Sequence, residues 1–238
     1  MIDFGIIASG SGSRLRDGGE ILPKPLVDIA GKPMIERLIN IMKVAGAERV
    51  YIVVNSDMME VVGFLDFLQD ELKLPFNIIT RKTESSLHTF YELMTLMKPS
   101  GKFIVSTVDS VFGQDAFLGF VSKFKQIPDN TAGLMAVSDY IDDEKPLYVE
   151  TDTDMRITAF KDDPFSGVKF VSAGVYGLKA DCFDLLSQCM ASGIKKMRNF
   201  QRKLIDEGML LKAFNLGRVI DVDHPADLKI ANDFFNPL

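Results

Sequence analysis

The sequence is poor in the residues that build disulfide frameworks and soft-metal sites. Its 238 residues include two cysteines, two histidines and no tryptophan. Cys182 and Cys189 lie in a helical pattern, and neither His88 nor His224 has a cysteine or a second histidine at metal-ligand spacing. No serine nucleophile elbow occurs either. We therefore expect reduced core thiols rather than a disulfide or a zinc site.

The sequence also lacks an excess of positive charge and any long apolar run. The formal net charge is −6 at neutral pH, whereas proteins that coat nucleic acids usually have a basic excess. No segment approaches the roughly 18 apolar residues of a membrane span, and we find no secretory leader. We expect a cytoplasmic protein with no nucleic-acid or membrane partner, and the sequence leaves open whether it forms a homo-oligomer.

What the sequence does contain is enough apolar material for a large core, because 47% of its residues are hydrophobic. Strand-like and helix-like segments alternate over the first part of the chain. The strands are expected at 2–8, 49–54, 76–80, 102–108 and 132–137, and the helices at 33–46, 57–72, 86–97 and 114–125. This alternation predicts an α/β fold with a Rossmann-like, mainly parallel sheet sandwiched by helices.

The pattern changes after residue 140. Short strands are expected at 147–151, 155–161, 169–178, 209–214 and 218–222, with helices at 181–190, 196–207 and 225–234. Turn-rich segments between the short strands indicate an antiparallel or mixed extension of the sheet. We find no internal repeat and no flexible linker, so we expect one continuous domain over 1–238.

A glycine-serine loop follows the first expected strand and is the clearest functional signal. Glycine has no Cβ, so backbone N–H groups there can approach an anion closely. Arg14 adds a planar cationic fork, and Lys24 adds a point charge on a backbone restricted by flanking prolines. We interpret this stretch as a cradle for the phosphates of a nucleoside triphosphate. Its expected nucleotide-binding residues are Ala8, Gly10, Ser11, Gly12, Ser13, Arg14 and Lys24.

Other phosphate-binding motifs fit less well. The sequence contains no Walker A string, and Leu15 stands where the dinucleotide fingerprint needs its third glycine. Taken alone, the two loop glycines also suit an ordinary strand-to-helix turn. Arg14 and Lys24, taken alone, also suit solvated surface charges.

The whole string, however, resembles the amino-terminal signature of the sugar-nucleotide pyrophosphorylases, the nucleotidyltransferases that make NDP-sugars. Their pattern is approximately Gly-x-Gly-Ser/Thr-Arg-Leu/Met, a short loop, Pro-Lys-Pro-Leu and then Gly-Lys-Pro. The matching positions are Gly10, Gly12, Ser13, Arg14, Leu15, Pro23, Lys24, Pro25, Leu26, Gly31, Lys32 and Pro33. The resemblance implies a GT-A-like, nucleotide-diphospho-sugar transferase-like fold. It also implies that Arg14 and Lys24 are catalytic and steady the triphosphate and the charge at its α-phosphorus.

Aspartates follow several expected strands, at the sheet edge where ligands of open parallel sheets gather. Carboxylate oxygens suit Mg²⁺, although aspartate after a strand also commonly caps a helix or makes a turn. The late string 221–228 (Asp-Val-Asp-His-Pro-Ala-Asp-Leu) is similar to one in the family. The resemblance implies that Asp109 and Asp223 bind the metal, although Val108 replaces the usual glycine before Asp109. We interpret Asp227 as a helix-terminus charge.

Residues on the acceptor side are also inferred from the resemblance. Lys161 matches a lysine that grips the sugar phosphate, with a solvated turn lysine as the alternative, and Gly174 lies in a matching Gly-Val-Tyr strand. The chain departs from the family at Leu147 and in the segment 83–86, where glycines are usual. The family comparison therefore suggests a nucleotide-binding part at 1–140 and an acceptor-binding part with a closing helix at 141–238.

These residues predict a nucleotidyltransferase that joins a nucleoside triphosphate to a sugar 1-phosphate, giving an NDP-sugar and pyrophosphate with Mg²⁺ as cofactor. One alternative is a cytidylyl- or other nucleotidyltransferase acting on a non-sugar phosphate such as phosphocholine. Others are a glycosyltransferase of similar fold and a regulatory relative that binds a nucleotide or nucleotide sugar without turning it over. The base, the acceptor and the pathway are not readable from the sequence.

Overall fold

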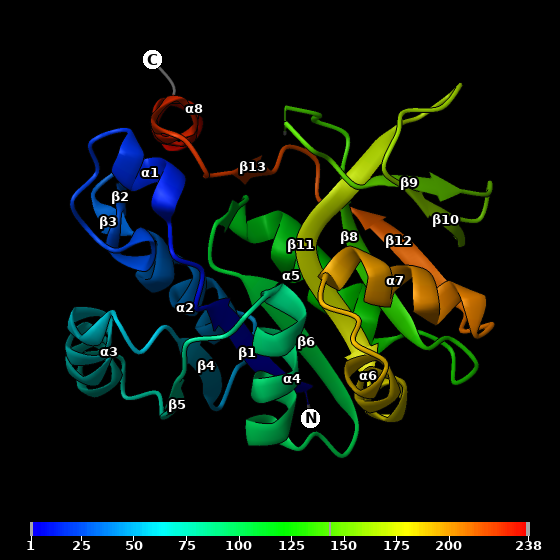
Figure 1. Cartoon of the computed structure of the whole chain (residues 1–238), viewed down its shortest axis with the longest axis horizontal. Helices are drawn as coiled ribbons and strands as arrows, with labels where there is room; N and C mark the ends of the chain where they lie inside the picture. Colours follow the sequence, from blue (N-terminus) through cyan, green and yellow to red (C-terminus); the bar gives the residue numbers. More distant parts are fainter. Residues whose placement is uncertain (1, 143, 237–238) are drawn as a thin grey trace.

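A nine-stranded sheet forms the centre of the computed structural model, which describes residues 2–142 and 144–236. One half of the sheet is parallel, in the order β6-β1-β4-β5. These strands are β1 (Ile2–Ala8), β4 (Val50–Val54), β5 (Phe76–Thr80) and β6 (Lys102–Thr107). Parallel strands need crossover connections, and helices provide them here (Figure 1).

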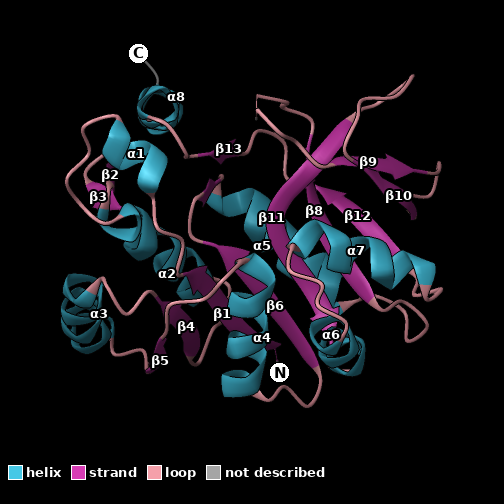
Figure 2. Ribbon diagram, viewed as in Figure 1, coloured by secondary structure: helices cyan, strands magenta, loops and turns pink. Residues whose placement is uncertain are grey.

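Helices cover both faces of this half, because its strands present apolar side chains to both sides of the sheet (Figure 2). In β1, Ile6 packs into one hydrophobic cluster and Ile7 into another, as the two-residue period of a strand requires. The first cluster includes side chains from α2 (Met34–Val44), α3 (Met59–Leu72) and α5 (Gln114–Lys125). The second includes side chains from α4 (Ser86–Met97), α6 (Cys182–Ala191) and α7 (Met197–Asp206).

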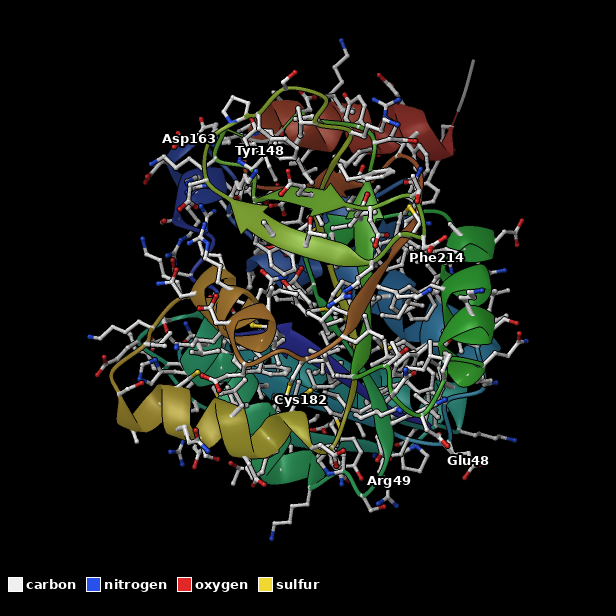
Figure 3. The ribbon with its side chains drawn as sticks, turned by 90° about the vertical axis from the view of Figure 1, so that its right-hand side faces the viewer. Glu48, Arg49, Tyr148, Asp163, Cys182 and Phe214 are labelled. Atoms are coloured by element: carbon white, nitrogen blue, oxygen red, sulfur yellow. The ribbon has the colours of Figure 1, made fainter. Side chains whose placement is uncertain are left out.

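The other half of the sheet is mixed, which confirms the expected extension. The long strand β11 (Phe170–Lys179) pairs antiparallel with β6, with β8 (Gly133–Ser138) and with β9 (Tyr148–Thr151). β10 (Ile157–Lys161) lies outside β9, and β12 (Leu211–Asn215) runs parallel to β8. Phe214, labelled in Figure 3, lies on β12, and its ring meets the Phe120 ring of α5 edge-on at 5.8 Å.

Several short elements were not expected from the sequence, and they surround the glycine-serine loop. They are α1 (Ser13–Asp17), the 3₁₀ helix η1 (Lys24–Leu26), the pair β2 (Asp28–Ile29) and β3 (Lys32–Pro33), and β7 (Ser110–Val111), which pairs with the expected strand β13 (Ile220–Asp221). With α8 (Pro225–Phe235), they enclose a third hydrophobic cluster that includes Leu15, Val27 and Val222. Elements of two or three residues carry no periodicity, so only this packing defines them.

Several expected boundaries shift by one or two residues, and two of the differences have a clear structural reason. The helix expected to begin at Pro33 begins at Met34, because Pro33 belongs to the short β3 strand. The strand expected over 218–222 is reduced to Ile220–Asp221, since only these two residues pair with β7. None of the helices in the described ranges has both the length and the apolar character that a membrane span needs.

Candidate active site

Two cations and two aspartates from four separate segments meet at one place. The Nζ atom of Lys24 lies 2.7 Å from Oδ2 of Asp109 and 2.5 Å from Oδ1 of Asp223. The Nη1 atom of Arg14 lies 2.5 Å from Oδ2 of Asp223. The Lys24 side chain is only 7% exposed, whereas that of Arg14 is 50% exposed. The structure thus brings together the four residues that the sequence singled out for catalysis and metal binding.

Tertiary pairing places the late aspartates beside Asp109. Asp109 follows β6, at the carboxyl end of the parallel strands, and its carbonyl accepts a hydrogen bond from the N–H of Val222 at 3.1 Å. β13 pairs with β7, so that Asp221 faces Ser110 across the two strands. Asp227 does act at the start of α8, because its Oδ2 accepts from the backbone N–H of Asp223 at 3.0 Å and of His224 at 2.7 Å.

Two glycines allow the loop to approach these residues closely. Gly12 precedes α1 with φ 61°, and a Cβ there would lie 2.9 Å from Cβ of Lys24. Gly18, just after α1, would place a Cβ 2.2 Å from Cγ of Pro225 at the start of α8. The glycine-serine loop and α1 therefore pack directly against Lys24 and against the start of α8, which follows Asp223. Within the loop, Ala8 is buried at the end of β1, while Gly10, Ser11 and Ser13 are exposed.

The charges of the cluster stabilise one another. Burial alone would lower the pKa of Lys24, but the neighbouring Asp109 and Asp223 carboxylates raise that pKa above its usual value. Burial alone would raise the pKa of Asp109, but Lys24, by charge and hydrogen bond, holds that pKa below its usual value. Both groups are therefore ionised at neutral pH.

Three carboxylates at this place form a candidate metal site. Oxygen atoms of Asp109, Asp221 and Asp223 lie within 4.8 Å of one another. The cluster already holds the Lys24 ammonium between two of these carboxylates, and oxygen donors suit a hard divalent cation. These residues therefore fit a metal ion. Asp221 was not expected to be a ligand. Its spacing of two residues from Asp223 is a signal that could have indicated this, because residues i and i+2 of a strand point to the same face.

A cavity of about 470 Å³ opens beside the aspartates. Gly174 lines it with φ 71°, and a Cβ on Gly174 would lie 2.1 Å from Oγ of Ser110. Lys161 is not among the residues that line the cavity. Its Nζ instead pairs with Oε1 of Glu150 at 3.1 Å and lies 4.3 Å from the centre of the Phe165 ring.

Cations that the sequence analysis did not single out line the same cavity instead. They are Lys145, Lys196 and Arg198, from the segment before β9 and from the start of α7. They belong to no motif and stand far from the loop in sequence, so only the packing of α7 reveals their position.

A buried hydroxyl cluster was also missed. Oγ of Ser9 lies 2.7 Å from Oγ1 of Thr89 and 3.0 Å from Oγ1 of Thr83, and the two threonine oxygens are 2.6 Å apart. Asn55 donates to the carbonyl of Ser9 at 3.2 Å. These bonds fasten the start of the glycine-serine loop to β4 and α4, and single serines and threonines carry no sequence signal for such an arrangement.

The family model described as nucleotidyl transferase matches residues 5–233. The chain is 28% identical over 243 residues to the bifunctional protein GlmU of Methanococcus vannielii, a match that covers 98% of this chain and 55% of that protein. The chain thus spans about half the length of the curated relatives it matches first.

Solved structures share the fold over the full chain. A putative glucose-1-phosphate thymidylyltransferase from Bacillus anthracis has a TM-score of 0.86 at 18% identity, covering 100% of this chain and 96% of that one. An inositol-1-phosphate CTP transferase from T. maritima has a TM-score of 0.79 at 22% identity, covering 100% and 98%. These likenesses confirm the expected mixed, mainly parallel α/β fold. With its sequence matched from residue 5 to residue 233, the chain belongs to the nucleotidyl transferase family.

Proposed function

We propose that this protein transfers a nucleotidyl group from a nucleoside triphosphate to a sugar 1-phosphate, releasing an NDP-sugar and pyrophosphate. The observation that carries this proposal is the cluster of Arg14, Lys24, Asp109 and Asp223 beside a cavity of about 470 Å³. That volume suits a small ligand. The solved structures of similar fold named above support it, because one is a putative glucose-1-phosphate thymidylyltransferase and the other an inositol-1-phosphate CTP transferase.

In the proposed reaction an oxygen of the acceptor phosphate forms a bond to the α-phosphorus of the triphosphate. The bond from that phosphorus to the oxygen bridging to the β-phosphate breaks, and pyrophosphate leaves. The acceptor is already an anion at neutral pH, so the reaction needs no general base. Its difficulty lies in bringing two anions into line, and the charges of Arg14 and Lys24 reduce that repulsion and stabilise the developing charge.

We propose Mg²⁺ as the metal, held by Asp109 and Asp223 with Asp221 as a further ligand. When bound there, a divalent ion would neutralise phosphate charge and orient the phosphate oxygens. Lys24 holds the Asp109 and Asp223 carboxylates close together and keeps the pKa of Asp109 below its usual value, so Asp109 is ready as a ligand. The Asp227 side chain fixes the backbone of the segment that carries Asp223.

The nucleotide would bind over the exposed loop residues Gly10, Ser11 and Ser13, with backbone N–H groups facing its phosphates. The acceptor would occupy the cavity that Gly174 lines. Lys161 stays a prediction as a phosphate-gripping residue; its Nζ pairs with Glu150, and it does not line the cavity.

The test is pyrophosphate release measured across four nucleoside triphosphates with an acceptor panel at saturating Mg²⁺. The panel contains neutral and acidic sugar 1-phosphates, inositol 1-phosphate and phosphocholine. We expect turnover with at least one sugar 1-phosphate. Exclusive turnover of inositol 1-phosphate or phosphocholine would replace the sugar in the proposal. Nucleotide binding without turnover of any acceptor would overturn the proposal in favour of a regulatory relative.

A further inference from the structure

The cavity beside the aspartates has an acidic end and a basic end. At the acidic end Asp109 and Asp221 line it, with Thr107 and Ser110. At the other end the lining includes Lys145, Lys196 and Arg198. Transfer to a phosphate monoester explains the acidic end, with its metal site, but leaves three further cations on the opposite wall without a role.

The strand β11 connects the two ends. A Cβ at Gly174 would lie 2.1 Å from Oγ of Ser110, so Gly174 marks the acidic end. Ser172 accepts a hydrogen bond from Nε2 of Gln201 in α7 at 3.2 Å, so Ser172 marks the basic end. Figure 1 shows β13 and α7 on opposite sides of β11. Two residues of a strand span about 6–7 Å, roughly the width of a sugar ring.

Positive charge at the basic end exceeds the negative charge that faces it. Nη1 of Arg198 lies 2.6 Å from Oδ1 of Asp162, and Nη2 of Arg202 lies 2.7 Å from Oδ2 of the same carboxylate. Two guanidinium groups thus share one carboxylate. Lys196 is exposed, and within residues 2–142 and 144–236 its side-chain ammonium has no hydrogen-bond or ion-pair partner.

Asp142 also lines the cavity, where its Oδ2 accepts a hydrogen bond from the Tyr140 hydroxyl at 2.7 Å. Even when Asp142 and Asp162 are both counted as negative, the three cations Lys196, Arg198 and Arg202 leave an excess of positive charge. The backbone carbonyl of Lys145 accepts from Nη2 of Arg198 at 2.9 Å, which holds that guanidinium on the cavity wall.

We infer that the acceptor carries a second anionic group, a carboxylate or a phosphate, that binds at the basic end beside Lys196 and Arg198 while its reacting phosphate lies near the aspartates. This inference rests on the proposed function and narrows its substrate class from neutral sugar phosphates to acidic ones. Arg198 offers a planar fork that matches either group, and Lys196 offers a mobile point charge.

The experiment compares two acceptors of the same ring. Glucose 1-phosphate and glucuronic acid 1-phosphate differ only in a hydroxymethyl group replaced by a carboxylate, and glucose 1,6-bisphosphate places a phosphate at the same position. We expect kcat/KM to be at least about tenfold higher for an acidic acceptor than for glucose 1-phosphate, as charge-assisted hydrogen bonds supply. The two acidic arms distinguish a carboxylate from a phosphate as the second group.

A matched pair of variants ties the preference to the basic end. Lys196→Met removes the cavity cation, and Lys195→Met removes a neighbouring lysine that instead pairs with Glu84 at 3.1 Å and does not line the cavity. We expect the acidic-to-neutral ratio of kcat/KM to fall about tenfold in Lys196→Met and to stay unchanged in Lys195→Met. An equal or higher kcat/KM for glucose 1-phosphate in the parent, or equal ratios in both variants, overturns the inference.

Calorimetry separates this inference from the proposed function. If no acceptor is turned over, the proposed function fails, yet titration of the three sugar phosphates into the parent and both variants still decides the question. Tighter binding of an acidic sugar phosphate, lost in Lys196→Met and kept in Lys195→Met, supports the second anionic group. Equal affinities for the neutral and the acidic sugar phosphates overturn the inference.

Discussion

The backbone N–H of Val222 donates to the carbonyl of Asp109 at 3.1 Å. This bond joins a residue near the end of the chain to one that follows the central strand β6, and β7 and β13 continue the pairing. It sets Asp221 and Asp223 beside Asp109, and Lys24 then bridges Asp109 and Asp223.

Removing the buried cation should affect both activity and stability. In Lys24→Met we expect turnover to fall by about 10²–10³, the usual cost of losing one electrostatic catalytic group. Asp109 and Asp223 are then left as neighbouring carboxylates, so the melting temperature should also fall. Steady-state kinetics and thermal unfolding provide the measurements. Lys32→Met is the control, because Lys32 is 52% exposed and its pair with Glu36 should contribute less than about 1 kcal/mol.

Metal should partly replace that lysine. A divalent ion bound among Asp109, Asp221 and Asp223 would restore positive charge to the cluster, so Mg²⁺ should raise the melting temperature of Lys24→Met more than that of the parent. Calorimetric scans with Mg²⁺ and with a chelator measure the difference. Equal Mg²⁺ shifts in the two proteins would contradict a metal site at these aspartates.

Asp221 should contribute to metal affinity. We expect Asp221→Asn to need about tenfold more Mg²⁺ for half-maximal pyrophosphate release, since hard cations gain affinity from carboxylate charge. Asp70→Asn on the exposed side of α3 should behave like the parent. A Mg²⁺ titration of all three proteins checks this, and an unchanged midpoint in Asp221→Asn would remove that residue from the ligand set.

Gly174 should tolerate no side chain. Gly174→Ala combines a positive φ of 71° with a Cβ placed 2.1 Å from Oγ of Ser110. We therefore expect the free energy of unfolding to fall by roughly 2–4 kcal/mol and the KM for the acceptor to rise. Gly193→Ala is the matched control, because Gly193 has φ 77° and no atom within 4 Å of its Cβ position. It should cost only about 1 kcal/mol of backbone strain. Urea unfolding of both variants separates the crowding against Ser110 from the backbone strain. Equal losses of unfolding free energy in the two variants would contradict the crowding.

The two thiols should be inert in the folded protein. Both cysteines are free and buried, and burial raises the pKa of Cys182, which begins α6 and is labelled in Figure 3, to about 12. Burial also raises the pKa of Cys189. A thiol whose pKa is raised stays protonated below that pKa, so at pH 8 only about 10⁻⁴ of Cys182 is thiolate. We expect no alkylation by iodoacetamide within an hour, and modification of both residues in denaturant. Fast labelling of the native protein would contradict this prediction and show that α6 opens transiently.

Much of the fold was predictable because it depends on local patterns. Alternating apolar strands and helices over the first part of the chain indicated the parallel sheet, and the shorter strands beyond residue 140 indicated the mixed extension. The division into a nucleotide-binding part at 1–140 and an acceptor-binding part at 141–238 stays a prediction. The sheet is continuous across that boundary, since β11 pairs with β6.

The sequence by itself determined which residues are predicted to bind the nucleotide, because Gly12, Arg14 and Lys24 lie within one contiguous motif. It did not determine the cations that line the cavity. The cations Lys196 and Arg198 reach the cavity only because α7 packs against β10 and β11, and Asp221 reaches Asp109 only through the pairing of β13 with β7. Contacts between distant segments leave no periodic or spacing signal in one chain, so only the tertiary structure decided them.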